Sequence, residues 1–185
     1  MGKIEDLCGN YESYISLPWE GQVAGAEKVI FAVYDKMDER RLRKRVTEFE
    51  IATQKADHQW DLVDLTGSFA EWMSDHKYKE MYFENPDDLS LALNRFRQFV
   101  AEKIRNTLQE CEDPENTVVA VLGAACLFGF VRVSEVLAEV QSDIRGRLLV
   151  FFPGSYEDNI YRLLDARDGW NYMAVPITPE SEVAP

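Results

Sequence analysis

The chain alternates short apolar runs with longer segments in which apolar residues recur every three or four positions. Nearly continuous apolar runs lie at residues 29–33, 117–122 and 147–152, and a more polar run lies at 60–65. A strand covered on both faces, as in a parallel sheet, lacks the usual alternation of polar and apolar positions. These runs therefore predict four strands of a buried, mostly parallel sheet.

The segments between these runs have helical periodicity. Residues 3–16 place Ile4, Leu7, Cys8, Tyr11 and Ile15 on one face, which favours a helix packed on the domain edge over a partner-docking helix. Further helices are expected from Asp38 to about Lys55, over 69–83, over 86–111 and over 133–140. Ser68 and Glu71 have the spacing of a capping box before the third of these five helices.

The order strand–helix–strand over 117–152 predicts a crossover between parallel strands. Pro153 and Gly154 are expected to end the strand at 147–152. Residues 160–164 and 170–175 flank the turn signal Asp168-Gly169 and predict an antiparallel hairpin at the sheet edge. The expected fold is a three-layer, Rossmann-like α/β domain with a mostly parallel sheet of five or six strands and an N-terminal helix.

Length and patterning favour one domain. We expect residues 1–27 to form the N-terminal helix and loop, 28–116 the first strands and covering helices, 117–179 a strand–helix–strand–hairpin unit, and 180–185 a flexible tail. A length of 185 residues is usual for a single domain.

Composition narrows the function classes. The net charge of −13 argues against direct DNA contact, because neutralising a phosphate backbone needs clustered Lys and Arg. Three widely spaced cysteines and two histidines signal neither disulfides nor a metal site, and no cofactor is expected. No signal peptide is recognisable and the longest apolar run is too short to cross a bilayer, so we expect a cytoplasmic protein without a membrane partner.

One helix carries a basic cluster. The predicted helix 38–55 has five consecutive or near-consecutive cations, Arg40, Arg41, Arg43, Lys44 and Arg45. Neighbouring glutamates can balance them, which favours a solvated surface. The alternative is a contact for an acidic partner or a nucleic acid, made by Arg41, Lys44 and Arg45.

The loops after the strands are the usual ligand sites of α/β proteins, here residues 123–132 and 153–158. The first is not a P-loop, because no Gly-Lys-Ser/Thr follows its glycines. Cys126 and Arg132, with five residues between them, resemble the phosphate loop of cysteine-dependent phosphatases. The histidine usual before that cysteine is replaced by Ala125, and the loop is apolar, so a structural cysteine and arginine are the favoured interpretation.

The strings FVRVSEVL and LVFFPGSYEDNIYRLLDARDGWNYMAVPI resemble the BrxB family of BREX bacteriophage-exclusion systems. The similarity is sharp over 118–179, looser over 28–65 and thin in the helices between. It implies a subunit that works with other BREX proteins, above all the alkaline-phosphatase-like PglZ. It assigns no catalytic residue.

The matching positions are candidates for binding a partner or ligand: Arg132, Ser134, Pro153, Gly154, Tyr156, Arg162, Asp165 and Trp170. An ion pair between Arg132 and Asp165 would tie the first loop to the hairpin. We expect a non-catalytic component acting by protein–protein interaction, with no small-molecule substrate. The alternatives are a phosphoryl-handling enzyme using Cys126 and Arg132, and a degenerate nucleotide or nucleic-acid binder.

Overall fold

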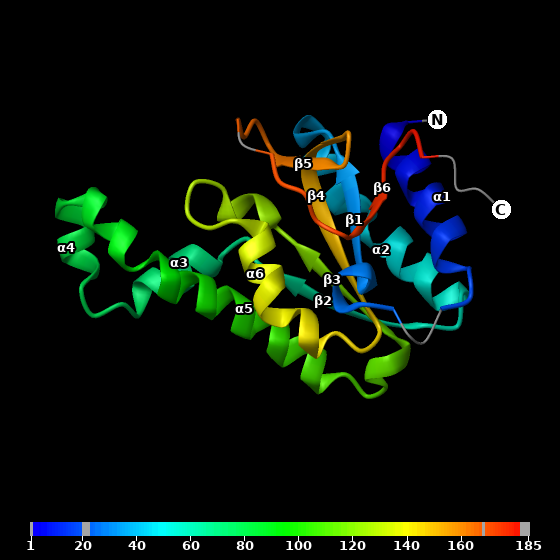
Figure 1. Ribbon diagram of the computed structural model, residues 1–185, viewed down its shortest axis with the longest axis horizontal. Helices are drawn as coiled ribbons and strands as arrows, with labels where there is room; N and C mark the ends of the chain where they lie inside the picture. Colours follow the sequence, from blue (N-terminus) through cyan, green and yellow to red (C-terminus); the bar gives the residue numbers. More distant parts are fainter. Residues whose placement is uncertain (1, 20–22, 168, 182–185) are drawn as a thin grey trace.

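A computed structural model describes residues 2–19, 23–167 and 169–181 (Figure 1). The longer helices are α1 (Lys3–Ile15), α2 (Glu39–Lys55), α3 (Ser68–Ser74), α4 (Lys79–Glu84), α5 (Leu93–Glu110) and α6 (Val133–Val140). The strands are β1 (Val29–Tyr34), β2 (Gln59–Asp64), β3 (Thr117–Leu122), β4 (Arg147–Glu157), β5 (Ile160–Leu163) and β6 (Val175–Ile177). Of the expected flexible tail, residues 182–185 lie outside the described part, as does Asp168 of the expected turn.

The six strands form one sheet in the order β2-β3-β4-β1-β6, with β5 attached to β4. The pairs in that order are parallel, and only β5 runs antiparallel to its neighbour. Every residue of β1 and β3 is buried, as expected for central strands covered on both faces. The predicted α/β class, sheet size and strand direction are confirmed.

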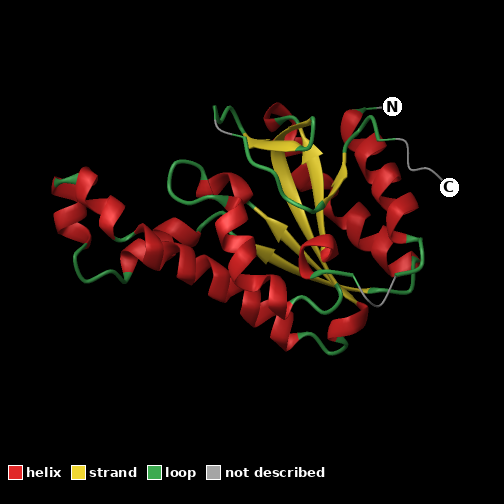
Figure 2. Ribbon diagram, viewed as in Figure 1, coloured by secondary structure: helices red, strands yellow, loops and turns green. Residues whose placement is uncertain are grey.

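Two hydrophobic cores lie on opposite faces of the sheet. Figure 2 shows helices on both sides of the strands. Successive side chains of a strand point to opposite faces, so Phe152 enters one core and Phe151 the other. Helices α5 and α6 cover the Phe152 side, and α1 and α2 cover the Phe151 side. The apolar face predicted for α1 is buried in full, which confirms that this helix packs on the domain.

The C-terminal hairpin is present, but its strands differ from those predicted. Strand β4 does not end at Pro153; it continues to Glu157 and turns back into β5, so that Gly154 lies opposite Leu163. Residue 170 contributes only a bridge to Tyr161, and the chain then crosses to β1 and pairs with it in parallel as β6. Strand pairing is a long-range choice that local turn signals could not decide.

The helices on the α5 side are shorter than predicted. The helix expected over 69–83 is two helices, α3 and α4, separated at residues 75–78, and the helix expected from 86 begins as a 3-10 segment, Pro86–Leu91. The capping-box prediction is wrong: Gly67 is the N-cap, and the Ser68 hydroxyl is buried with no hydrogen-bond partner among the described residues. Residues 75–92 consequently form an arm, and α4 lies far from the sheet in Figure 1.

The close approach of β5 to Gly154 predicts that adding a methyl group at this position destabilises the protein. A Cβ at Gly154 would overlap the backbone carbonyl oxygen of Arg162, so Gly154→Ala must push β5 away from β4. We expect it to lower the free energy of unfolding by about 1–3 kcal/mol, measured by urea denaturation. Gly9→Ala is the control, because nothing lies within 4 Å of its Cβ position and alanine favours the α1 helix. Equal stability of the two variants would contradict this account of the hairpin.

Candidate functional site

A crevice opens at the carboxyl ends of β1, β2, β3 and β4, the usual ligand position in α/β folds. Its volume is about 490 Å³. It is lined by residues from the ends or following loops of all four strands and from β5 and α2: Lys36, Glu39, Arg43, Thr66, Gly123, Ala125, Cys126, Pro153 and Leu164. Gly123 adopts a positive φ of 83°, and a Cβ there would crowd Thr66, so glycine is required at this turn.

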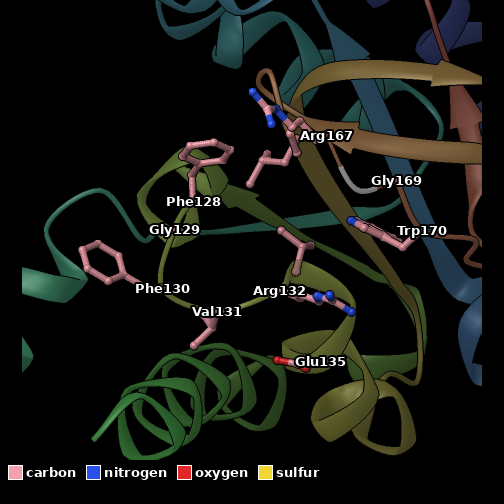
Figure 3. Close-up of a pocket in the computed structure, with 12 residues that line it drawn as sticks. Phe128, Gly129, Phe130, Val131, Arg132, Glu135, Arg167, Gly169 and Trp170 are labelled. Atoms are coloured by element: carbon pink, nitrogen blue, oxygen red, sulfur yellow. The ribbon is translucent and has the colours of Figure 1, made fainter. Parts of the chain in front are cut away.

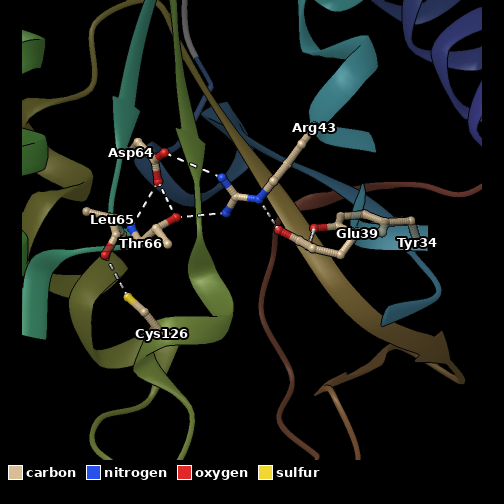
Figure 4. Close-up of polar contacts among 7 residues, drawn as sticks. All are labelled: Tyr34, Glu39, Arg43, Asp64, Leu65, Thr66 and Cys126. Carbon is tan, nitrogen blue, oxygen red and sulfur yellow. Dashed lines mark hydrogen bonds and ion pairs between the residues drawn. The ribbon is translucent and has the colours of Figure 1, made fainter. Parts of the chain in front are cut away.

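Arg43 of α2 reaches across this crevice and binds three groups (Figure 4). Its Nε donates to Glu39 Oε1 at 2.7 Å, its Nη2 donates to Thr66 Oγ1 at 2.7 Å, and its Nη1 lies 3.5 Å from Asp64 Oδ2. The Tyr34 hydroxyl donates to Glu39 from the other side. The polar side chains that line the crevice are therefore bound to one another.

The pKa shifts agree with a satisfied network. Burial alone would raise the pKa of Asp64, but hydrogen bonds from Thr66 and the charge of Arg43 lower it below its usual range. Burial alone would lower the pKa of Arg43, but its bonds with Glu39 and Asp64 raise it. Both groups stay charged and bound to each other, which leaves neither poised as a base or acid.

Cys126 is not an activated thiol. Its Sγ donates to the Leu65 carbonyl oxygen at 3.0 Å, and burial, followed by the charge of Asp64, raises its pKa to about 11. Arg132 lines a different cavity from the one that holds Cys126. The loop therefore does not bring these two residues together as a phosphate-binding cradle.

That second cavity, of about 700 Å³, lies between the β3–α6 loop and the chain after β5 (Figure 3). We call it the loop cavity. It is lined by Phe128, Gly129, Phe130, Val131, Arg132, Val133, Glu135, Leu163, Ala166, Arg167, Gly169 and Trp170. Two candidates from the sequence, Arg132 and Trp170, are thus brought to one site from segments far apart in the chain.

The other candidate residues are dispersed. Ser134 lies in the first turn of α6, Pro153 lines the crevice, and the Tyr156 hydroxyl donates to Asn159 Oδ1 at 2.8 Å within the hairpin. Gly154 and Arg162 lie on the paired strands β4 and β5. The expected pairing of Arg132 with Asp165 is wrong, because Asp165 pairs with Lys36.

The basic face of α2 is largely neutralised. Arg41 pairs with Asp38 at 3.1 Å, and Arg45 pairs with Glu48 at 3.0 Å and with Glu5 of α1 at 2.5 Å. Lys44 is exposed, and the described residues offer it no ion-pair partner. These pairs are those of a solvated helix surface that also holds α1 to α2.

The arm, residues 75–92, was missed by the sequence analysis. Four of its large apolar side chains are exposed: Tyr78, Met81, Phe83 and Leu91. The sequence analysis placed these residues in two long helices, over 69–83 and 86–111. In such helices, apolar residues at regular spacing indicate a buried face. The signal that could have found them is the break in periodicity at residues 75–78, followed by apolar side chains within an acidic segment.

Within the described residues, no group of three or more His, Cys, Asp and Glu side chains could hold a metal ion. None of the described helices has the length and apolar character needed to cross a membrane.

The state of Cys126 predicts slow thiol chemistry. A pKa of about 11 in place of the ordinary 9.0 reduces the thiolate fraction about 100-fold at neutral pH. We expect alkylation of Cys126 by iodoacetamide, followed by mass spectrometry at pH 7.5, to be slower in the native protein than in guanidinium by at least that factor. Arg132→Ala should leave the rate unchanged. Fast native labelling that depends on Arg132 would restore the phosphatase-like alternative.

Comparison with known proteins identifies the family. The family described as BREX protein BrxB matches residues 30–177, which covers both cavities, the arm and all six strands except the first residue of β1. No curated protein and no solved structure matches the chain. Since the match spans most of the sequence, the chain belongs to the BrxB family and is a component of a BREX phage-defence system.

Proposed function

We propose that this protein is a non-catalytic BREX subunit that acts by protein–protein interaction, with the alkaline-phosphatase-like PglZ as its partner. Family membership supports a role in a multi-subunit system. The pairing of Arg43 with Asp64 in the crevice and the raised pKa of Cys126 support a non-catalytic role. The observation that carries the proposal is the arm, which displays apolar side chains where a monomeric domain would be expected to hide them.

The exposure on the arm is large. Phe83 is 67% exposed and Leu91 is 83% exposed, and Tyr78 and Met81 add to the same segment. Apolar patches of this kind on a folded domain mark interaction sites, and aromatic residues and Met are enriched at protein interfaces. The arm therefore offers a partner the side-chain types that contribute most to binding.

The base of the arm is packed, so these side chains are displayed on an ordered support. Tyr82 is buried, and its ring lies 5.1 Å from that of His76, which in turn lies 5.0 Å from Trp72. The Lys79 ammonium donates to the Ser74 carbonyl oxygen at 2.8 Å across the break between α3 and α4. A surface already held in shape loses less conformational entropy on binding.

Charge indicates the partner's chemistry. Residues 75–92 contain five acidic and two basic side chains, a net charge of −3. The complementary surface on PglZ is an apolar groove with a basic rim. Salt would screen the charged rim but not the apolar contacts, so association should weaken moderately as ionic strength rises.

The arm predicts which substitutions break the complex. Wild-type protein should co-purify with tagged PglZ from the same operon in a fixed stoichiometry. Phe83→Asp and Leu91→Asp should each weaken binding at least 10-fold, since loss of a central apolar anchor costs about 2 kcal/mol or more. Calorimetric titration of PglZ with each variant measures this.

Two controls match the exposure of these residues away from the arm. Met173, at 67%, and Met37, at 82%, are replaced by Asp in the same assay and should bind as wild type. All four variants should keep the wild-type melting temperature to within a few degrees. If wild-type protein forms no complex with PglZ at micromolar concentration, PglZ is not the partner. If the control variants weaken binding as much as the arm variants do, the arm is not the binding surface.

A further inference from the structure

The loop cavity carries two arginines in an acidic protein. In a chain of net charge −13, two arginines, Arg132 and Arg167, line it, and both are exposed. Neither has an ion-pair or hydrogen-bond partner among the residues that the structure describes. Figure 3 shows Arg132 beside Glu135 at one side of the cavity and Arg167 beside Phe128 at the other.

Two described acids near these arginines have other partners. Glu135 lies 4.0 Å from Arg97 of α5, and Asp165, two residues before Arg167, pairs with Lys36. Since none of the described acids pairs with Arg132 or Arg167, an anion from outside can bind their guanidinium groups. Arginine presents a planar fork of donors that matches phosphate oxygens.

The walls between the arginines are aromatic and are held in place. Trp170 packs against Tyr161 at 5.4 Å and against Phe152 at 5.8 Å, and Phe130 stacks on Phe69 at 4.3 Å with an interplanar angle of 9°. Phe128 is 45% exposed and lines the cavity. Aromatic faces beside guanidinium groups are the surfaces on which nucleic-acid bases stack.

We propose that the loop cavity binds a nucleoside phosphate, with the phosphate on Arg132 and Arg167 and the base against Phe128 and Trp170. A volume of about 700 Å³ is in the range of small-ligand sites. The site is distinct from the arm and does not rest on the proposed partner. It replaces the expectation that this chain binds no small molecule.

The bound nucleoside phosphate could be a free nucleotide or one nucleotide of a single-stranded nucleic acid. The experiment therefore titrates the protein with AMP, ATP and a 12-residue oligothymidylate, following calorimetric heat and tryptophan fluorescence at 50 mM and 200 mM salt. Binding of AMP or ATP within tenfold of the oligonucleotide assigns a free nucleotide. The ligand is single-stranded nucleic acid if the oligonucleotide binds more than 100-fold more tightly and the salt dependence of its binding constant corresponds to the release of about one to two ions.

Variants place the binding in the cavity. Arg132→Ala and Arg167→Ala should each weaken binding about 10-fold and their combination about 100-fold, and Phe128→Ala should weaken it several-fold. Arg145→Ala is the control, because Arg145 is exposed and lies just before β4, at the opposite end of the sheet. Arg132 and Arg167 are exposed and lack described partners, so these variants should fold.

Absence of binding by all three probes at 1 mM would overturn the inference. Binding that survives the double arginine variant but is lost on replacing Arg41, Lys44 and Arg45 with Ala would overturn it as well, since the site would then lie on α2. Neither result would bear on PglZ binding, which is measured separately with the arm variants.

Discussion

An aromatic cluster on one face of the sheet positions everything that follows β4. Phe31 of β1 and Phe152 of β4 contact Tyr161 of β5 edge to face, at 4.6 and 5.9 Å, and both also contact Trp170 edge to face. Such contacts add to the free energy of burial. Because Trp170 is also a wall of the loop cavity, the cluster that folds the hairpin onto the sheet also shapes that cavity.

The carboxyl edge of the sheet, where this fold class usually binds ligands, is occupied by the protein itself. Arg43 joins Glu39, which follows β1, to Asp64 at the end of β2 and to Thr66 just after it. The network is only partly buried, with the side chain of Arg43 33% and that of Asp64 46% exposed, but its charged groups are bound to one another. The two binding sites that we propose, the loop cavity and the arm, lie outside this crevice.

The sequence predicted the parts of the fold that depend on local periodicity. Buried strands such as β1 and β3 and the inward face of α1 follow from apolar spacing alone. The extension of β4 past Pro153 does not, because it depends on distant partners: the Pro153 carbonyl oxygen accepts from the Leu164 N–H at 2.8 Å, and Gly154 leaves room for the backbone of Arg162. At the site, Arg132 and Trp170 were identified as candidates. Their common cavity was not, because it is created by the folding of the hairpin, and the arm was hidden by a helix break that no proline or glycine marks.

The loop cavity and the arm belong to one packed row of rings. Phe130 stacks on Phe69, whose ring lies 5.9 Å from that of Trp72 at the base of the arm, and Trp72 continues through His76 to Tyr82. A packed row has discrete arrangements rather than continuous ones, so a shift of Phe130 must be accommodated by its neighbours. If a ligand in the cavity and a partner on the arm favour different arrangements of this row, their binding free energies are coupled, and the coupling is equal in both directions. Binding at the loop cavity would then change the affinity of the arm for its partner, and the reverse, without any change in the sheet.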